Sequence, residues 1–127
     1  MARKRRAKGE LTKLGEQLDK LVAQYVKKRD KFRCQWCGSP DHLQASHIIP
    51  KREGLVCRWN TENVITLCLR CHLETWHKNP LWAAEWFHEK YPGKYRILKK
   101  LLRVHKVYTA DERRQMIAEL RDKIARL

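Results

Sequence analysis

The sequence has no hydrophobic run long enough to cross a membrane. Its best apolar stretch, residues 81–87, is interrupted by Glu85 and is far shorter than the about 20 residues that a spanning helix needs. The basic N-terminus is not followed by an apolar segment, so a secretory signal peptide is not expected. These absences argue against a membrane protein, and we expect a cytoplasmic protein with no membrane partner.

Acidic residues are also scarce. The 127 residues include 29 Lys and Arg but only 14 Asp and Glu, which gives a formal net charge of +15. Hydrophobic residues make up 43% of the chain, too many for a disordered protein, and the length suits one domain. A positive excess of this size favours a nucleic-acid partner with several phosphate contacts. We expect a flexible basic arm over residues 1–9 and a single domain over residues 10–127.

Cysteines are few, but four of the five form two C-x-x-C pairs. In a reducing compartment this pattern is typical of a zinc site rather than of disulfides. Four thiolates would close the tetrahedral shell of a structural Zn²⁺ and leave no position for water. The predicted ligands are Cys34, Cys37, Cys68 and Cys71, whereas Cys57 is expected to be a buried residue without chemistry.

Periodicity and capping signals divide the rest of the domain into elements. Residues 10–31 carry a stripe of Leu11, Leu14, Leu18, Leu21 and Tyr25, which packs on the protein's own core or forms a short dimeric coiled coil. The following core, residues 32–78, has a strand over 43–49 and a loop or second short strand over 52–59. A helix over 67–77 begins with the second cysteine pair. Helices are also expected over 80–93, over 94–105 and after a capping box at Thr109–Glu112, completing the flank of residues 79–127.

Three polar residues lie within or beside the cysteine framework. His47 lies in the segment Ser46-His-Ile-Ile-Pro50, Asn63 precedes the apolar run into the second cysteine pair, and His72 follows that pair directly. Together with both C-x-x-C pairs, this arrangement resembles the HNH endonuclease superfamily. The resemblance implies an α+β, mainly helical fold with a zinc-stabilised ββα core of the His-Me finger type.

The resemblance also implies the roles of these residues. His47 is expected to be the general base, because a neutral imidazole accepts a proton from water near neutral pH. His72 is expected to bind a catalytic Mg²⁺ or Mn²⁺, and Asn63 to order the loop that holds the base. Many HNH enzymes have Asp or His before the base, whereas this chain has Ser46, so the metal shell needs another ligand. His77, Asp41, Glu53 and Glu74 are the candidates.

A closer resemblance is to the Rap (NinG) recombination endonucleases of phages related to lambda. It rests on Ala45-Ser-His47, Arg58-Trp-Asn-Thr-Glu-Asn63 and Cys68-Leu-Arg-Cys71. It implies a structure-selective nuclease that cuts Holliday junctions and other branched DNA in phage recombination. It also implies a homodimer, in the host cell cytoplasm if the protein is phage-encoded. The expected interface is the stripe of the first helix and that of the last, which has Ile117, Leu120, Ile124 and Leu127 on one face. The residues expected to contact DNA are Arg3, Lys4, Arg5, Arg6, Lys51, Arg52 and Arg58.

Two other functions remain open from the sequence. The same cysteines and charge suit a non-catalytic, zinc-stabilised nucleic-acid-binding module, although such a module has no need of a poised histidine base. A general nicking or homing-type HNH nuclease would instead read sequence and ignore branched structures. Cleavage of matched linear and branched substrates separates the three possibilities.

Overall fold

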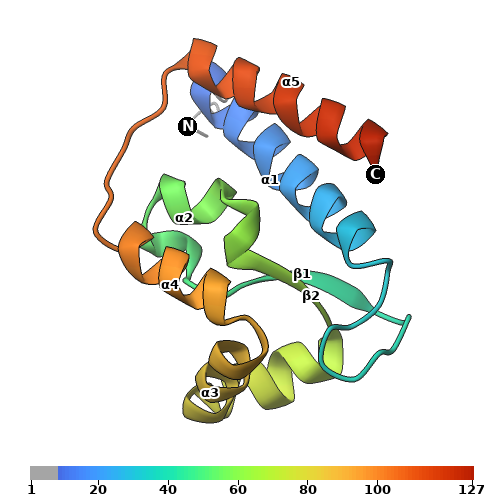
Figure 1. Ribbon diagram of the computed structural model, residues 1–127. Helices are drawn as coiled ribbons and strands as arrows, with labels where there is room; N and C mark the ends of the chain where they lie inside the picture. Colours follow the sequence, from blue (N-terminus) through green and yellow to red (C-terminus); the bar gives the residue numbers. More distant parts are fainter. Residues whose placement is uncertain (1–8) are drawn as a thin grey trace, which may run out of the picture.

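The structure is a computed structural model that describes residues 9–127. The arm residues Arg3, Lys4, Arg5 and Arg6 lie outside the described part of the chain. The elements, in order, are α1 (Glu10–Arg29), β1 (Leu43–His47), η1 (Lys51–Glu53), α2 (Leu55–Trp59), η2 (Thr61–Asn63), β2 (Val64–Cys68), η3 (Cys71–His77), α3 (Pro80–Lys90), α4 (Pro92–Leu101) and α5 (Ala110–Arg126) (Figure 1). The predicted mainly helical α+β fold with a ββα core is confirmed: β1, β2 and η3 form that core, and the other helices flank it.

The hairpin of β1 and β2 lies at the centre of the molecule, between two hydrophobic clusters. The two strands are antiparallel, with His47 opposite Val64 and Leu43 opposite Cys68. All five residues of β2 are buried, because elements cover both faces of the hairpin. Since side chains alternate between the faces of a strand, Ile65 and Val64 enter two different hydrophobic clusters.

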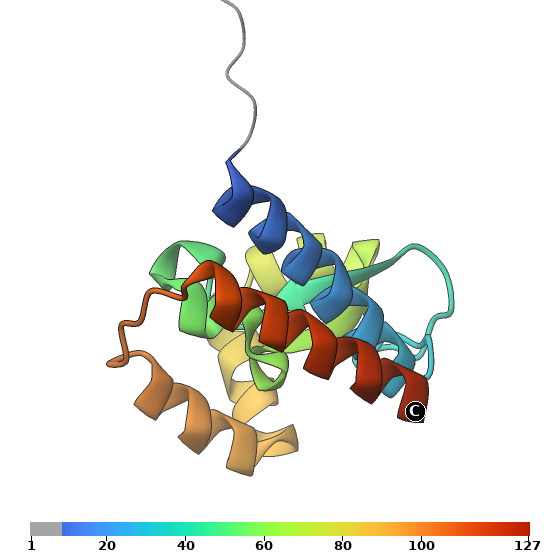
Figure 2. The ribbon, with the colours of Figure 1, turned by 90° about the horizontal axis from the view of Figure 1, so that it is seen from above.

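One cluster, which we call the helix-packed core, lies between α1, α5 and one face of the hairpin. Leu18, Val22 and Val26 of α1 meet Ile117 and Leu120 of α5, and the two helices run side by side (Figures 1 and 2). The predicted stripe on the first helix therefore packs on the protein's own core. Most of both stripes is covered within one chain, with only the end residues Leu11 and Leu127 exposed, so they leave little free surface for the expected dimer interface.

The other cluster, which we call the cysteine core, lies on the opposite face of the hairpin. It combines Cys34, Cys68 and Cys71 with Ile65, Leu67 and the fully buried Phe87 of α3. Trp36, Trp76 and Trp86 pack around it, as expected for aromatic residues that build a core, whereas Trp82 is 57% exposed. Cys57 is buried here as predicted.

The segment between the strands differs from the prediction. Residues 52–59 are neither a loop nor a strand but lie in η1 and α2, separated by Gly54. Gly54 has φ 125°, a conformation that side chains oppose and that lets one helical turn end and another begin. The second strand is instead Val64–Cys68, where a continuous apolar run is buried on both faces.

The outer edge of β2 is covered by the end of α1. The Arg29 guanidinium donates to the carbonyl oxygens of Thr61 at 2.9 Å and Val64 at 2.7 Å. Asp30 accepts a hydrogen bond from the Thr66 backbone N–H at 2.9 Å, and the Gln35 N–H donates to the Thr66 carbonyl at 2.9 Å. These contacts join the C-terminal end of α1, and the residues that follow it, to β2.

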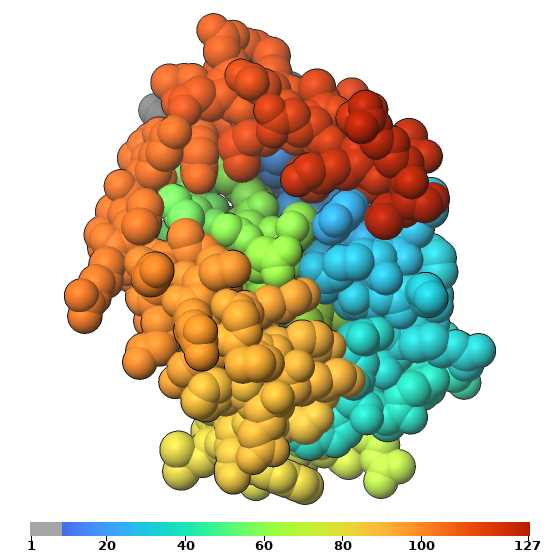
Figure 3. All heavy atoms as spheres, viewed as in Figure 1, coloured from blue at the N-terminus to red at the C-terminus, as the bar shows by residue number. Residues whose placement is uncertain are grey.

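The last helix begins as the sequence predicts. Thr109 accepts from the Glu112 N–H, and Glu112 accepts from the Thr109 N–H, each at 3.1 Å, which completes a capping box. A long connection leads from α4 to α5, and residues of α2 and η2 are visible in the hollow below α5 (Figure 3). Trp59 and Thr61 line this hollow together with Met116 and Leu120. No helix in the described part of the chain has the length and apolar character needed to cross a membrane.

Candidate functional site

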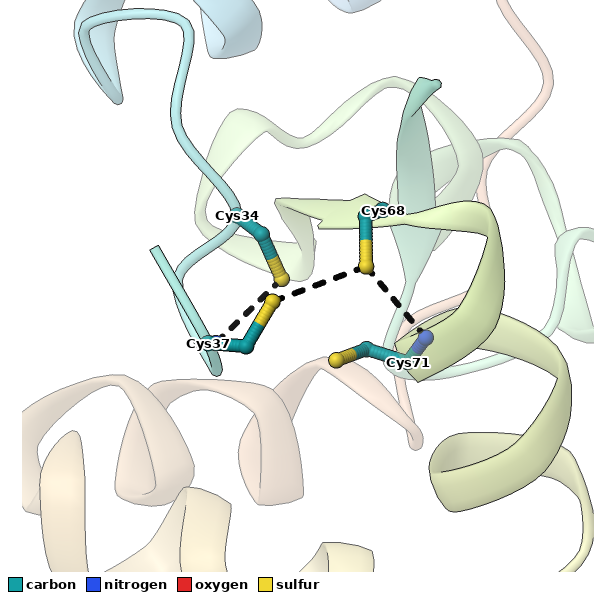
Figure 4. A group of neighbouring side chains, drawn as sticks. All are labelled: Cys34, Cys37, Cys68 and Cys71. Carbon is teal, nitrogen blue, oxygen red and sulfur yellow. Dashed lines mark hydrogen bonds between the residues drawn. The ribbon is translucent and has the colours of Figure 1, made fainter. Parts of the chain in front are cut away.

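Four cysteine sulfurs converge where the loop after α1 meets the junction of β2 and η3 (Figure 4). Their Sγ atoms all lie within 4.8 Å of one another, and Cys37 Sγ is 3.7 Å from Cys68 Sγ. Sulfurs bound tetrahedrally to zinc at about 2.3 Å lie about 3.8 Å apart, so the spacing fits Zn²⁺. The cluster of Cys34, Cys37, Cys68 and Cys71 therefore suits the structural zinc site that the sequence predicts.

Backbone amides prepare these sulfurs to be thiolates. The Cys37 N–H points at Cys34 Sγ and the Cys71 N–H at Cys68 Sγ, each at 3.5 Å. Burial alone would raise the pKa of the Cys34 thiol, but donation from neighbouring backbone N–H groups lowers that pKa to about 7. Burial and the adjacent sulfurs raise the pKa of Cys71. Ionisation of all four thiols therefore requires a cation among them.

A second group of donors is formed by Ser46 of β1 and by two histidines of η3, one at its start and one at its end. Ser46 Oγ is 2.6 Å from His72 Nδ1, and His72 Nε2 is 2.9 Å from His77 Nε2. Two nitrogens bound at right angles to an ion at about 2.1 Å lie about 3.0 Å apart, so the pair suits two neighbouring positions of a metal shell. Burial, and then the charge of His77, lowers the pKa of His72, which favours the neutral imidazole that a metal binds.

The geometry of η3 explains why His77 joins His72. Residues 71–77 form a π-helix, in which positions five apart lie above one another. An ordinary α-helix would pair His72 with Trp76 instead. Within the described residues the four cysteines are the only group of three or more His, Cys, Asp or Glu side chains able to share an ion. Asp41, Glu53 and Glu74 therefore do not complete a three-ligand site with the two histidines.

His47 ends β1 and contacts the carbonyl end of α2. Its Nε2 lies 2.9 Å from the Arg58 carbonyl oxygen. A carbonyl can only accept, so Nε2 carries the hydrogen and Nδ1 keeps its lone pair. Burial lowers the pKa of His47 below its ordinary value of 6.5; the Arg58 hydrogen bond opposes this, and the nearby Lys51 charge adds to it. The ring is therefore neutral at pH 7.

Asn63 is fully buried and holds the segment that follows His47. Its Oδ1 accepts from the Ile49 N–H at 2.7 Å, and its Nδ2 donates to the carbonyls of Ile49 at 2.9 Å and Cys57 at 2.8 Å. A single side chain thus ties both ends of residues 49–57, the segment that contains η1 and the start of α2. This is the arrangement that a loop-ordering role requires.

The residues expected to contact DNA lie in different environments. Lys51 and Arg52 are exposed in η1. Arg58 binds the Asp19 carboxylate of α1 through Nε at 2.8 Å and Nη2 at 2.5 Å, so its guanidinium is held within the protein. Asp19 was not among the residues predicted from the sequence, because nothing in the helical stripe sets this polar position apart.

The histidines are connected through neighbouring residues of β1. Ser46 contacts His72 on the cysteine-core face, while His47 contacts Arg58 and lines a cavity of about 70 Å³ with Asp19 and Lys51 on the other side. Adjacent strand residues point to opposite faces. His47 and His72 therefore approach the same end of β1 from its two sides.

Comparison with known protein families adds one finding. Residues 34–77 match the family described as HNH endonuclease. Comparisons with curated proteins and with solved structures find no match. The matched segment contains both cysteine pairs, His47, Asn63, His72 and His77. Residues 34–77 are thus similar to the HNH endonucleases, a family that hydrolyses phosphodiester bonds in nucleic acid.

Proposed function

We propose that this protein is a metal-dependent DNA endonuclease in which His47 is the general base. The observation that carries the proposal is the hydrogen bond from His47 Nε2 to the Arg58 carbonyl, inside the HNH segment. It fixes the ring in the tautomer that has an unprotonated Nδ1. Neutral at pH 7, this nitrogen can take a proton from the water that attacks a DNA phosphorus.

His72 and His77 would hold the catalytic ion. If His72 Nδ1 donates to Ser46 Oγ, its Nε2 carries a lone pair, which now faces His77 Nε2 and which would bind a metal placed beside both nitrogens. A bound divalent ion would supply positive charge to the non-bridging phosphate oxygen and to the leaving 3′ oxygen. Two imidazole ligands favour Mn²⁺ over Mg²⁺, which prefers oxygen ligands.

The remaining residues position the substrate and the base. Exposed Lys51 and Arg52 lie in η1, a few residues after β1, and would bind DNA phosphates near the His47 end of the strand. Asn63 keeps residues 49–57 in register so that the Arg58 carbonyl stays opposite His47. The zinc site takes no part in the reaction and fixes the start of η3 relative to the hairpin.

The finer proposal is that the substrate is branched DNA, including four-way junctions. It is supported by the resemblance of residues 45–47, 58–63 and 68–71 to the Rap (NinG) nucleases. Two symmetric cuts in a junction call for two active sites, which a homodimer would provide. Because the stripes of α1 and α5 are mostly covered within one chain, such a dimer would use another surface.

A cleavage assay tests the proposed base. Wild-type protein with Mn²⁺ or Mg²⁺ should cut supercoiled DNA, and His47→Ala should cut about 10²–10⁴-fold more slowly. His105→Ala, which changes an exposed histidine of the α4–α5 connection, is the matched control and should cleave normally. Equal rates for wild type and His47→Ala would exclude His47 as the base. DNA binding without cleavage under any metal would leave a zinc-stabilised binding module.

A substrate panel tests the finer proposal. Linear duplex, flap and four-way junction of the same sequence should be cut at rates that increase with branching. Light scattering should show a dimer at the concentrations used. Equal cleavage of linear and branched DNA, or cleavage at one defined sequence in linear duplex, would favour a general or homing-type nuclease instead.

A further inference from the structure

Asp19 of α1, which lies outside the HNH segment, binds the side chains of the two residues whose shared peptide bond contacts His47. Asp19 accepts three hydrogen bonds: from Arg58 Nε at 2.8 Å, from Arg58 Nη2 at 2.5 Å and from Trp59 Nε1 at 2.9 Å. Both donor residues come from the last turn of α2. One carboxylate therefore fixes two consecutive side chains on either side of one peptide bond.

That peptide bond carries the oxygen that His47 contacts. The Arg58 carbonyl belongs to the peptide between Arg58 and Trp59, and it accepts from His47 Nε2 at 2.9 Å. Carbonyls in the last turn of a helix have no partner within the helix, so this oxygen is free to hold the ring. Its direction depends on the two side chains that Asp19 binds, because they anchor the peptide on both sides.

The charges around His47 also depend on Asp19. Asp19 of α1, Lys51 of η1 and Arg58 of α2 face the ring. Asp19 is the one negative charge among these three groups, and it is paired with Arg58. Without it, two cations would face the imidazole, and its protonated form would be less favourable.

The α5 helix also helps to hold Trp59 in place, through Arg113. The Arg113 guanidinium lies 5.0 Å from the centre of the Trp59 ring and donates to the carbonyls of Tyr108 at 3.0 Å and Leu11 at 2.8 Å. A methyl group at Gly15 would lie 3.2 Å from Trp59, so this position of α1 lets the indole approach closely. Trp59 is therefore held on several sides while its N–H points at Asp19.

We propose that Asp19 is a positioning residue for His47, acting through the Arg58–Trp59 peptide to set the orientation and tautomer of the imidazole. Its consequence for catalysis rests on the proposed function, in which His47 is the base. Its consequence for the ring itself does not, because the hydrogen bonds exist without substrate or metal. The two consequences can be measured separately.

Nitrogen NMR of His47 tests the positioning directly in protein that carries structural zinc only. In wild type, the Nε2 resonance should show the protonated nitrogen and Nδ1 the unprotonated one at pH 7. Asp19→Asn should give averaged tautomers and a lower titration midpoint for this ring. Asp122→Asn removes an exposed acid that pairs with Arg126 on α5 and should leave the His47 resonances unchanged. A wild-type His47 spectrum in Asp19→Asn would overturn the proposal.

Cleavage kinetics test the functional consequence. Asp19→Asn should cleave about 10–100-fold more slowly, with DNA affinity unchanged when measured on zinc-loaded protein without added Mg²⁺ or Mn²⁺, and with the acidic limb of its pH–rate profile moved to lower pH. Arg58→Lys, which keeps the charge but loses the two-pronged contact, should act in the same direction. Combining both changes should cost no more than the larger one alone. If Asp19→Asn does not fold, Arg58→Lys carries the same NMR test, and an unaltered His47 spectrum overturns the proposal.

The outcomes separate the two proposals. If His47→Ala cleaves like wild type while Asp19→Asn disturbs the His47 resonances, the base assignment fails and the positioning stands. If His47→Ala is inactive while Asp19→Asn keeps both the wild-type resonances and the wild-type pH profile, the positioning fails and the base stands.

Discussion

The two faces of the hairpin are covered by different kinds of side chain, which come from different parts of the chain. The cysteine core joins segments through four sulfurs and a group of aromatic rings, and it lies largely within the HNH segment. The helix-packed core joins α1 and α5, from opposite ends of the described chain, mainly through aliphatic side chains. The segment that matches the family therefore depends on helices outside it to cover the helix-packed face of the hairpin.

The comparison shows why the flanking helices matter to the site. Ser46 and His72 lie toward the cysteine core, while His47 lies toward Asp19 and Arg58. Under the proposed function, one half would supply the metal ligands and the other would supply the surroundings of the base. A chemical site assembled from both faces of one hairpin needs both faces covered.

The largest expected effect comes from removing the zinc. Structural zinc contributes about 10 kcal/mol or more in small zinc domains, as much as the total stability of many domains. Stripping the ion with a strong chelator, or the substitution Cys68→Ser, should unfold the cysteine core and lower the melting temperature sharply, measured by circular dichroism alongside zinc content. Cys57→Ala, at a buried cysteine outside the cluster, should retain its zinc. Full zinc loss with an unchanged melting curve would contradict a structural role.

Matched core truncations ask whether the two halves unfold together. Phe87→Ala in the cysteine core should cost about 3–5 kcal/mol, and Leu18→Ala in the helix-packed core about 2–5 kcal/mol, because both side chains are fully buried. Denaturant titration followed by tryptophan fluorescence and by circular dichroism measures each loss. The shared strand β2 predicts a single transition for both variants. Two separate transitions in either variant would show that the cores are independent.

The pH dependence of cleavage reports on the helix-packed face. Burial lowers the pKa of His47 below 6.5, so the neutral base persists as the pH falls past that value. Cleavage should keep more than half of its maximal rate at pH 6.5 and then decline about tenfold per pH unit below the pKa of the ring. Rates measured between pH 4.5 and 8 with Mn²⁺ test this. A decline that already begins near pH 7.5 would show that another group is titrating.

The smallest effect comes from the cap of α5. Thr109→Ala removes the side-chain acceptor of the capping box and should cost about 1 kcal/mol, because the Glu112 N–H loses its partner. Thermal melting with the zinc site loaded gives the measurement. Asp111→Ala changes an acid beside the cap that is not part of the box and should cost less. An equal loss for the two variants would indicate a general charge effect at the helix start.

Much of this arrangement is predictable from local sequence signals. Three short sequence patterns predict their structures correctly. They are the heptad-like stripe of residues 10–31, the capping box at Thr109 and the two C-x-x-C pairs, which correspond to α1, to the start of α5 and to the cysteine cluster. The helical turns between residues 52 and 59 were missed because Gly54 and charged residues dominate a segment too short for a clear period. Its structure is decided by tertiary contacts, above all those of Asn63.

The details of the candidate site are harder to predict. The pairing of His72 with His77 needs a π-helix, and no known residue preference predicts a π-helix from the sequence. The contact of Asp19 with Arg58 joins residues far apart in sequence, and no pattern along the helix marks that partner. The sequence therefore identifies the reactive side chains better than it identifies the residues that orient them.

The cover that Arg29 and Asp30 place on β2 has a consequence for how copies of this chain behave toward each other. An open strand rim offers unpaired N–H and C=O groups on which another strand can grow, the usual start of fibrous aggregation. Here the backbone groups of Val64 and Thr66 on that rim already have partners from the end of α1 and from Gln35. The most hydrophobic strand of the protein is thereby barred from recruiting neighbours, even at the high local concentrations reached when many copies crowd onto one nucleic-acid molecule.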